Sequence, residues 1–260
     1  MKSIPSSYIK TDQEIETIRE NGKLIAAILA EVATAAVAGV STWELDQLAE
    51  SKIKAVGGVP AFKNFGPKGH EFPATLCTSV NDEIVHGVPS KKAILREGDI
   101  ISLDIGMRYK GLYTDTAITV GVGKISAEAA NLMAVTKKSL QAAIAVAKVG
   151  NTIGDIGAAT QKVVEAAGFS VVRDLVGHGV GYEVHEDPQV PGYGRAGSGL
   201  RLEPGMVLAI EPMVTVGSYK ILVDKDDWTI RTADGSLSAH FEHTVAITKK
   251  GPRILTLNSK

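Results

Sequence analysis

Two stretches near the start of the chain have the apolar spacing of amphipathic helices. Thr11 and Glu14 form a T-x-x-E capping box, in which side chains satisfy backbone N–H groups at a helix start. Residues 12–37 then carry apolar positions at helical spacing, and Gly39 follows as a stop signal. A second box begins a shorter stretch over about residues 41–56. The pattern therefore predicts a pair of helices.

A second helix pair is predicted over residues 126–148 and 153–167, with Gly150 between them. The two pairs correspond at a constant offset of 111 residues: Gly39 with Gly150, Ser41 with Thr152, Leu45 with Ile156, Ala55 with Ala166, and Gly57 with Gly168. Helix ends favour such residues in any protein, so the five matches are weak support on their own. We nevertheless predict an internal duplication.

Strand-like sequence follows each helix pair. It covers residues 74–88, 99–121, 170–176, 206–216 and 240–249. We therefore expect an α+β fold in which two αα-plus-β halves pack around a central antiparallel sheet, with a cleft where the halves join. The halves would span about residues 11–122 and 123–257 of a single domain, after an N-terminal extension of residues 1–10.

The composition is that of an ordinary globular protein, with 44% hydrophobic and 22% charged residues. A net charge of −1 provides no overall basic field, so no specific nucleic-acid binding is expected. The single cysteine, Cys77, excludes an internal disulfide and suits a reducing compartment. The N-terminus lacks an apolar signal-peptide core, and the most apolar window, residues 24–40, is too short for a membrane span. A cytoplasmic protein without a membrane partner is expected.

Apolar and polar residues alternate along the segment DIISLDIGMRYKGLYTDTAITV, which predicts a β-hairpin. A two-residue loop at Tyr109 and Lys110 would set Asp104 directly opposite Asp115, whereas a bulge at Gly111 would shift the register by one. Two such acids commonly lie at a solvent-exposed sheet edge. Asp104, however, lies within a strongly apolar strand, where a buried carboxylate pair requires a shared proton or a cation.

Two more acidic residues have similar surroundings. Glu211 shares a strand face with apolar residues in GMVLAIEPMV, and Glu242 lies in the apolar segment SAHFEHTVAIT. Four carboxylates in apolar strands, two from each half, together with one imidazole, suit two divalent ions that bridge a reactive water. Manganese, iron, cobalt and zinc all fit such a set. Cys77 has no evident base beside it, so no competing nucleophile is indicated.

Two histidines, His178 and His185, lie seven positions apart in the segment GHGVGYEVH. Three glycines within this segment disfavour a helix. In a straight strand, an odd separation places two side chains on opposite faces of the sheet. We therefore expect the chain to bend between the two histidines, so that each has a separate role.

The order and the local sequences of these residues resemble the type I methionine aminopeptidases of peptidase family M24. The resemblance rests on VNDEIVHGVP, SLDIG with YTDTA, GHGVGYEVHEDPQ, AIEPMV and FEHTVAIT, and it spans about residues 11–257. It implies the pita-bread fold and a dinuclear metal-dependent hydrolase that removes N-terminal methionine. Five metal ligands are implied: Asp104, Asp115, His178, Glu211 and Glu242.

The resemblance also implies the roles of residues beside the metal. His185 matches a histidine that contacts the substrate near the scissile bond, and His86 matches one that contacts the scissile amide nitrogen. Glu211 would carry a proton from the attacking water to the leaving amine. Three further histidines are interpreted as structural or surface residues: His70, His240 and His243.

The methionine pocket is placed by the resemblance at Phe72, Cys77 and Trp228, since aromatic and soft groups suit an unbranched thioether. The chain departs from the bacterial pattern at Gly69, where an aromatic residue is common, and at Val184. Both departures leave the size of the pocket open. A preference for a small second residue in the substrate is carried over as an expectation.

Two other functions fit the same residues less well. A proline-specific aminopeptidase or prolidase of this fold uses a similar ligand set but usually carries an additional N-terminal domain. A catalytically inactive pita-bread protein that acts as a binding module would have lost ligands that this chain retains. The methionine-specific reading implies nascent polypeptide N-termini as partners and a monomeric protein, and it leaves a transient ribosome contact open.

Overall fold

The computed structural model describes residues 5–258, so the first four residues of the expected N-terminal extension lie outside the described residues. Four long helices are present, and their ends lie within two residues of the positions expected from the sequence. Their bounds are α1 Asp12–Ala35, α2 Thr42–Ala55, α3 Ala127–Val146 and α4 Ile153–Ala166, and a short 3-10 helix, η1, covers Ser6–Tyr8.

Capping boxes begin α1 and α2, as expected. The Glu14 carboxylate accepts a hydrogen bond from the backbone N–H of Thr11 at 2.7 Å, and the box at the start of α2 has the same arrangement. A third box, between Thr152 and Asp155, begins α4. Its acid is aspartate instead of the glutamate or glutamine of the usual pattern, so the sequence did not indicate it.

The second helix pair repeats the first in three dimensions. The bounds of α4 are those of α2 at the offset of 111 residues, and α3 ends at the same offset from the end of α1. The glycines that follow the two long helices also agree, because Gly39 and Gly150 both have a φ of 92°. The fold therefore consists of two pseudo-symmetric αα-plus-β halves, while the division near residue 122 stays a prediction.

The strands form one large sheet and two small ones. Their bounds are β1 Val59–Pro60, β2 Leu76–Val80, β3 Glu83–Val85, β4 Ile100–Tyr109, β5 Leu112–Gly121, β6 Ser170–Val171, β7 Gly177–Gly179, β8 Glu186–Val190, β9 Val207–Ile210, β10 Met213–Thr215, β11 Ile221–Val223, β12 Ile230–Thr232, β13 Ser238–His240, β14 Glu242–Thr248 and β15 Gly251–Ile254. The large sheet has the order β1-β4-β5-β14-β9-β7-β8, with β2 also paired to β4 and β15 to β14. The small sheets have the orders β13-β10-β6 and β11-β12-β3, and the strand pairings are antiparallel as expected.

Four of the expected strand regions are more broken than the sequence pattern indicated, and the region 74–88 is divided into β2 and β3. The region 170–176 is strand only at Ser170–Val171. Glu211 and Pro212 interrupt the region 206–216, since proline has no N–H to donate to a sheet. Phe241 separates β13 from β14, so the chain passes from a small sheet to the large one at this residue.

The expected register of the β4–β5 hairpin was wrong by two positions. Asp104 is paired with Ala117, and Asp115 with Gly106, because the loop consists of Lys110 and Gly111. Both loop residues have positive φ, 50° and 87°, as a tight two-residue hairpin turn requires, and glycine adopts this conformation readily. A shift of two leaves every side chain on its expected face, so the two acids are diagonal neighbours on one face of the sheet.

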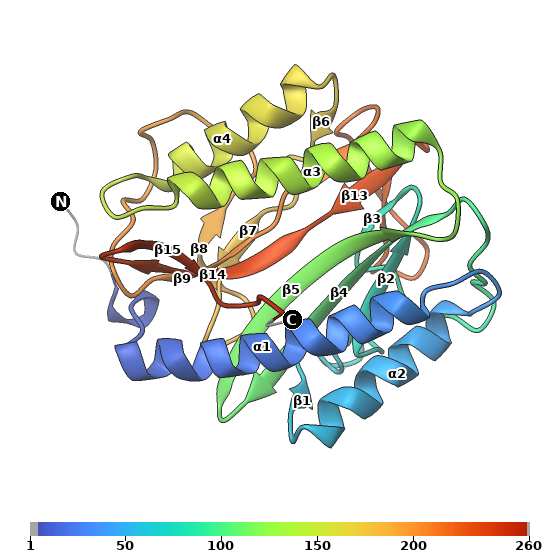
Figure 1. Ribbon diagram of the computed structural model, residues 1–260, viewed down its shortest axis with the longest axis horizontal. Helices are drawn as coiled ribbons and strands as arrows, with labels where there is room; N and C mark the ends of the chain where they lie inside the picture. Colours follow the sequence, from blue (N-terminus) through green and yellow to red (C-terminus); the bar gives the residue numbers. More distant parts are fainter. Residues whose placement is uncertain (1–4, 259–260) are drawn as a thin grey trace.

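Each helix pair covers strands of its own half, and the strands run between the two pairs in the view of Figure 1. Leu29 of α1 and Leu103 of β4 belong to one buried apolar cluster. Ile156 of α4 and Val245 of β14 belong to the corresponding cluster of the second half. Within residues 5–258, no helix combines the length and the apolar character required to cross a bilayer.

A buried aspartate joins α2 to the start of β2. The Asp46 carboxylate accepts hydrogen bonds from the backbone N–H groups of Thr75 at 2.8 Å and Leu76 at 3.0 Å. In the Asp46→Ala variant both amides lose this acceptor, at a cost of about 1–3 kcal/mol for each buried group. We expect a correspondingly lower free energy of unfolding in urea titrations. The exposed Asp12→Ala variant is the control, and equal stability of the two variants would contradict this account.

Candidate functional site

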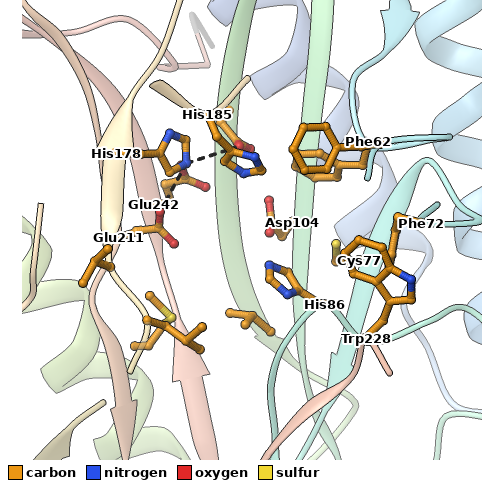
Figure 2. A pocket seen from close by; sticks show the side chains of 16 residues that line it. Phe62, Phe72, Cys77, His86, Asp104, His178, His185, Glu211, Trp228 and Glu242 are labelled. Atoms are coloured by element: carbon orange, nitrogen blue, oxygen red, sulfur yellow. Dashed lines mark ion pairs between the residues drawn. The ribbon is translucent and has the colours of Figure 1, made fainter. Parts of the chain in front are cut away.

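All five predicted metal ligands line one pocket. Asp104 lies on β4, Asp115 on β5, His178 on β7 and Glu242 on β14, while Glu211 directly follows β9. The order β4-β5-β14-β9-β7 makes these strands successive neighbours in the large sheet, so residues far apart in sequence converge. Figure 2 shows Glu211, Glu242 and His178 on one side of the pocket and Asp104 facing them.

Small residues separate the acidic side chains along the sheet. Ala117 is paired with Asp104 on one side and with Glu242 on the other. Asp115 is paired with Gly106. Because the intervening positions have little or no side chain, the carboxylates share one space above the sheet. Ligand atoms of Asp104, Asp115 and Glu242 lie within 4.8 Å of one another.

The charges of these three carboxylates are poorly compensated by the protein. One oxygen of each, Oδ1 of Asp104 and Asp115 and Oε1 of Glu242, is buried without a hydrogen-bond partner among the described residues. Burial raises the pKa of Asp104 to about 6, and burial together with the neighbouring acids raises the pKa of Asp115 and Glu242 well above the usual range. Clustered oxygens of this kind fit divalent cations, which would supply the missing positive charge.

Glu211 has a different environment, because imidazoles flank it. Its Oε1 lies 3.4 Å from His178 Nε2, and its Oε2 lies 3.3 Å from His240 Nε2. Burial raises the pKa of Glu211, but His240 and the other nearby imidazoles outweigh burial and leave the pKa lowered. His178 Nδ1 lies 2.8 Å from the carbonyl oxygen of Gly179, an arrangement in which Nδ1–H donates and Nε2 is left as a ligand atom.

The contact between His240 and Glu211 was missed in the sequence. His240 is 1% exposed, so the surface alternative for this residue was wrong. The spacing of His240 and Glu242, two residues apart in an alternating segment, was the available signal for a shared face. His243 has the opposite orientation, and its Nδ1 lies 3.0 Å from Thr256 Oγ1, which agrees with a structural role.

Two further histidines line the pocket on either side of Asp104 in the view of Figure 2. The ring centroid of His185 lies 4.5 Å from that of His178, with an interplanar angle of 79°. Desolvation in the pocket wall, followed by the neighbouring His178, lowers the pKa of His185 to about 4. Burial likewise lowers the pKa of His86. Both rings are therefore neutral near pH 7 and can each donate one hydrogen bond.

Aromatic residues form the apolar wall of the pocket. The three predicted members, Phe72, Cys77 and Trp228, all line it, and the ring centroids of Phe72 and Trp228 lie 5.3 Å apart. Val184 is buried in the same apolar cluster. The cavity has a volume of about 190 Å³, enough for one side chain of moderate size.

Several pocket residues were not singled out in the sequence, and the two aromatic ones among them are Phe62 and Phe65. Both lie outside periodic strand or helix sequence, so no pattern distinguished them from ordinary core residues. The Phe65 ring is edge-on to that of His185, with centroids 4.8 Å apart. Gly69 is exposed and a Cβ there would meet open space, while the neighbouring His70 stacks on Trp228 with centroids 5.5 Å apart.

The chain is similar to known proteins over nearly its whole length. The model of metallopeptidase family M24 matches residues 16–249. The chain is 51% identical to a methionine aminopeptidase of Clostridium acetobutylicum, over 96% of this chain and 98% of the relative. It is 47% identical to methionine aminopeptidase 1 of Bacillus subtilis, over 95% of this chain and 98% of the relative.

Solved structures give the same result at the level of the fold. The crystal structure of a methionine aminopeptidase from Thermotoga maritima matches with a TM-score of 0.92 and 46% identity, covering 95% of this chain and 98% of that chain. A prolidase from Pyrococcus furiosus matches with a TM-score of 0.77 and 24% identity, covering 97% of this chain but 66% of that chain. The second match shows a shared fold alone. The chain therefore belongs to metallopeptidase family M24 and has its pita-bread fold.

Proposed function

We propose that the protein is a metal-dependent methionine aminopeptidase that removes the N-terminal methionine of nascent polypeptides in the cytoplasm. The observation that carries the proposal is a cluster of buried, unpartnered carboxylate oxygens beside an aromatic pocket of side-chain size. The methionine aminopeptidases that the chain resembles are nearly full-length matches at about half identity. The prolidase likeness is far weaker, which favours methionine over proline specificity.

Five residues would hold two divalent ions of manganese, iron, cobalt or zinc: Asp104, Asp115, His178, Glu211 and Glu242. Bound ions would lower the pKa of a water and polarise the peptide carbonyl. The unpartnered oxygens of the three buried acids support this assignment, as does His178 Nε2, which lies 3.4 Å from the Glu211 carboxylate. Retention of all five ligands argues against an inactive binding protein.

The remaining steps belong to side chains of the chain itself. Glu211, held ionised by its imidazole neighbours, would take a proton from the attacking water and pass it to the leaving amine. Neutral His185 would donate a hydrogen bond to the carbonyl oxygen, and neutral His86 would contact the amide nitrogen. The methionine side chain would occupy the wall that includes Phe72 and Trp228.

The proposed activity is tested by comparing two substrates on protein stripped with a chelator and then reloaded. Protein reloaded with manganese or cobalt is expected to hydrolyse Met-Ala-Ser, whereas the stripped protein should lose almost all turnover. Ala-Pro should be hydrolysed poorly by both, because the methyl group of alanine leaves most of the apolar pocket unfilled. Preferential cleavage of Ala-Pro would instead support the proline-specific alternative.

Removal of one acidic ligand should separate catalysis from folding. The Glu242→Gln variant is expected to lose metal-dependent turnover by at least about 100-fold, more than changes outside the ligand set usually cost. Its metal-free form should be at least as stable as the parent, since a buried charge has been removed. Turnover of Met-Ala-Ser and thermal melting measure the two effects. The exposed Glu128→Gln variant is the matched control, and near-normal activity of Glu242→Gln would refute the ligand assignment.

The raised carboxyl pKa values determine how the stability of the metal-free protein changes with pH. A folded state whose carboxyls have raised pKa values binds more protons than the unfolded chain, so its stability falls as pH rises. Histidines with lowered pKa values act in the opposite direction, but only below about pH 6.5, their unfolded pKa. Between about pH 6.5 and 8.5 we therefore expect urea titrations of the metal-free protein to show a free energy of unfolding that falls as the pH rises.

Two further measurements test the origin of this loss. The Glu242→Gln variant should have a shallower pH dependence than the parent, because one of the raised carboxyls is absent. Added manganese should raise the melting temperature more at about pH 7.5 than at pH 5.5, because ionised ligands bind the metal. A metal-free protein that becomes more stable as the pH rises above neutrality would contradict the raised pKa values of Asp115 and Glu242.

A further inference from the structure

The ammonium group of Lys10 is buried at the junction between the N-terminal segment and the second half. Its side chain is 1% exposed, and its Nζ forms an ion pair with Glu186 and donates a hydrogen bond to the carbonyl oxygen of Ser7 at 3.1 Å. Nζ also lies 4.7 Å from the centroid of the Tyr182 ring. A buried charge of this kind is tolerated only when it is paired, so the contact with Glu186 is a strong constraint.

The Glu186 carboxylate holds the backbone turn that precedes His185. Its Oε1 accepts hydrogen bonds from the backbone N–H groups of Tyr182 at 2.5 Å and Glu183 at 2.9 Å. The carboxylate therefore closes the short segment 182–186 on itself, with the imidazole of His185 projecting into the pocket. A closed segment of this kind holds its side chains in a narrow range of positions.

Lys10 and β5 together confine this segment from two directions. A Cβ at Gly181 would lie 2.5 Å from Cε of Lys10, so the backbone and the lysine stem are in close contact. On the β5 side, the carbonyl oxygen of Gly181 accepts a hydrogen bond from the N–H of Tyr113 at 2.7 Å. Lys10 is itself anchored, because its backbone N–H donates to the carbonyl oxygen of Gly205 at 2.8 Å.

We infer that Lys10 is a positioning residue for His185, acting through Glu186 and the turn at 182–186. The inference rests on the proposed function, in which His185 contacts the substrate. Within the described residues, Lys10 is not part of the pocket lining, so it acts only through others. Without the ammonium group, the Glu186 carboxylate is more stable when it turns toward water. It then releases the backbone N–H groups of Tyr182 and Glu183. Small misplacements of a substrate-positioning group can cost about 100-fold in rate.

A double-mutant cycle with His185 tests the inference. The Lys10→Met variant keeps the length of the stem and removes the charge, and it is expected to lower kcat for Met-Ala-Ser by about 10- to 100-fold. KM and the bound metal content should change less than about threefold, because Lys10 lies outside the pocket that contains the ligands, Phe72 and Trp228. In a His185→Ala background, the same substitution should lower kcat less than about twofold, since the group it positions is absent.

Matched variants separate positioning from general stability. Lys110→Met breaks the exposed ion pair with Glu20 and should leave kcat within about twofold of the parent. The paired Lys10→Met/Glu186→Gln variant keeps an oxygen acceptor for the two amides and should recover part of the lost rate. If Lys10→Met does not fold, the paired variant replaces it in the double-mutant cycle. The remaining loss of kcat in the paired variant should vanish in the His185→Ala background.

Each outcome supports or overturns the positioning role of Lys10. An equal loss of kcat in the parent and in the His185→Ala background would mean a merely structural role, and an unchanged kcat would overturn the inference outright. The imidazole NMR signals of His185 provide a readout that does not depend on turnover, and they should shift or broaden in the Lys10→Met variant. If the parent hydrolyses no methionyl peptide, the proposed function fails, while unshifted His185 signals would overturn the positioning role separately.

Discussion

The site depends on one physical constraint: several carboxylates are buried away from water on one face of the central sheet. Asp104, Asp115 and Glu242 each keep a buried oxygen without a partner among the described residues, and burial raises the pKa of all three. A folded protein bears such a cost only where something else offsets it. Apolar clusters on the helix-covered sides of both halves provide the stability, and divalent ions would provide the missing charge.

The two-fold character of the fold explains why the site lies at the centre. Each half contributes acidic residues from its own strands, and β14 of the second half lies directly beside β5 of the first. Helix pairs cover both halves: α2 and α4 have the same bounds at a fixed offset, and α1 and α3 end at that offset. The pocket therefore lies where the two halves meet. Lys10, in the segment that precedes α1, adds an ion pair with Glu186 of the second half.

Local patterns in the sequence predicted most of the fold. Capping boxes placed the starts of α1 and α2, and alternation placed the acids on one strand face. The hairpin register was wrong because the sequence alone did not decide whether Tyr109 or Gly111 completed the loop, a choice made by backbone conformation. The contacts of Phe65 with His185 and of Lys10 with Glu186 were missed, since they join residues outside any periodic pattern. The contact of His240 with Glu211 was also missed, and only the spacing of His240 and Glu242 indicated a shared face.

The place of β14 in the large sheet has a consequence for synthesis of the chain. This strand lies between β5 and β9, yet both of those strands precede it in sequence. During translation they emerge first and expose unpaired edges, which are surfaces prone to wrong association. The sheet closes late and over long sequence distances, a topology that makes folding slow. Until Glu242 and its neighbours leave the ribosome, the nascent enzyme would be both inactive and vulnerable to aggregation.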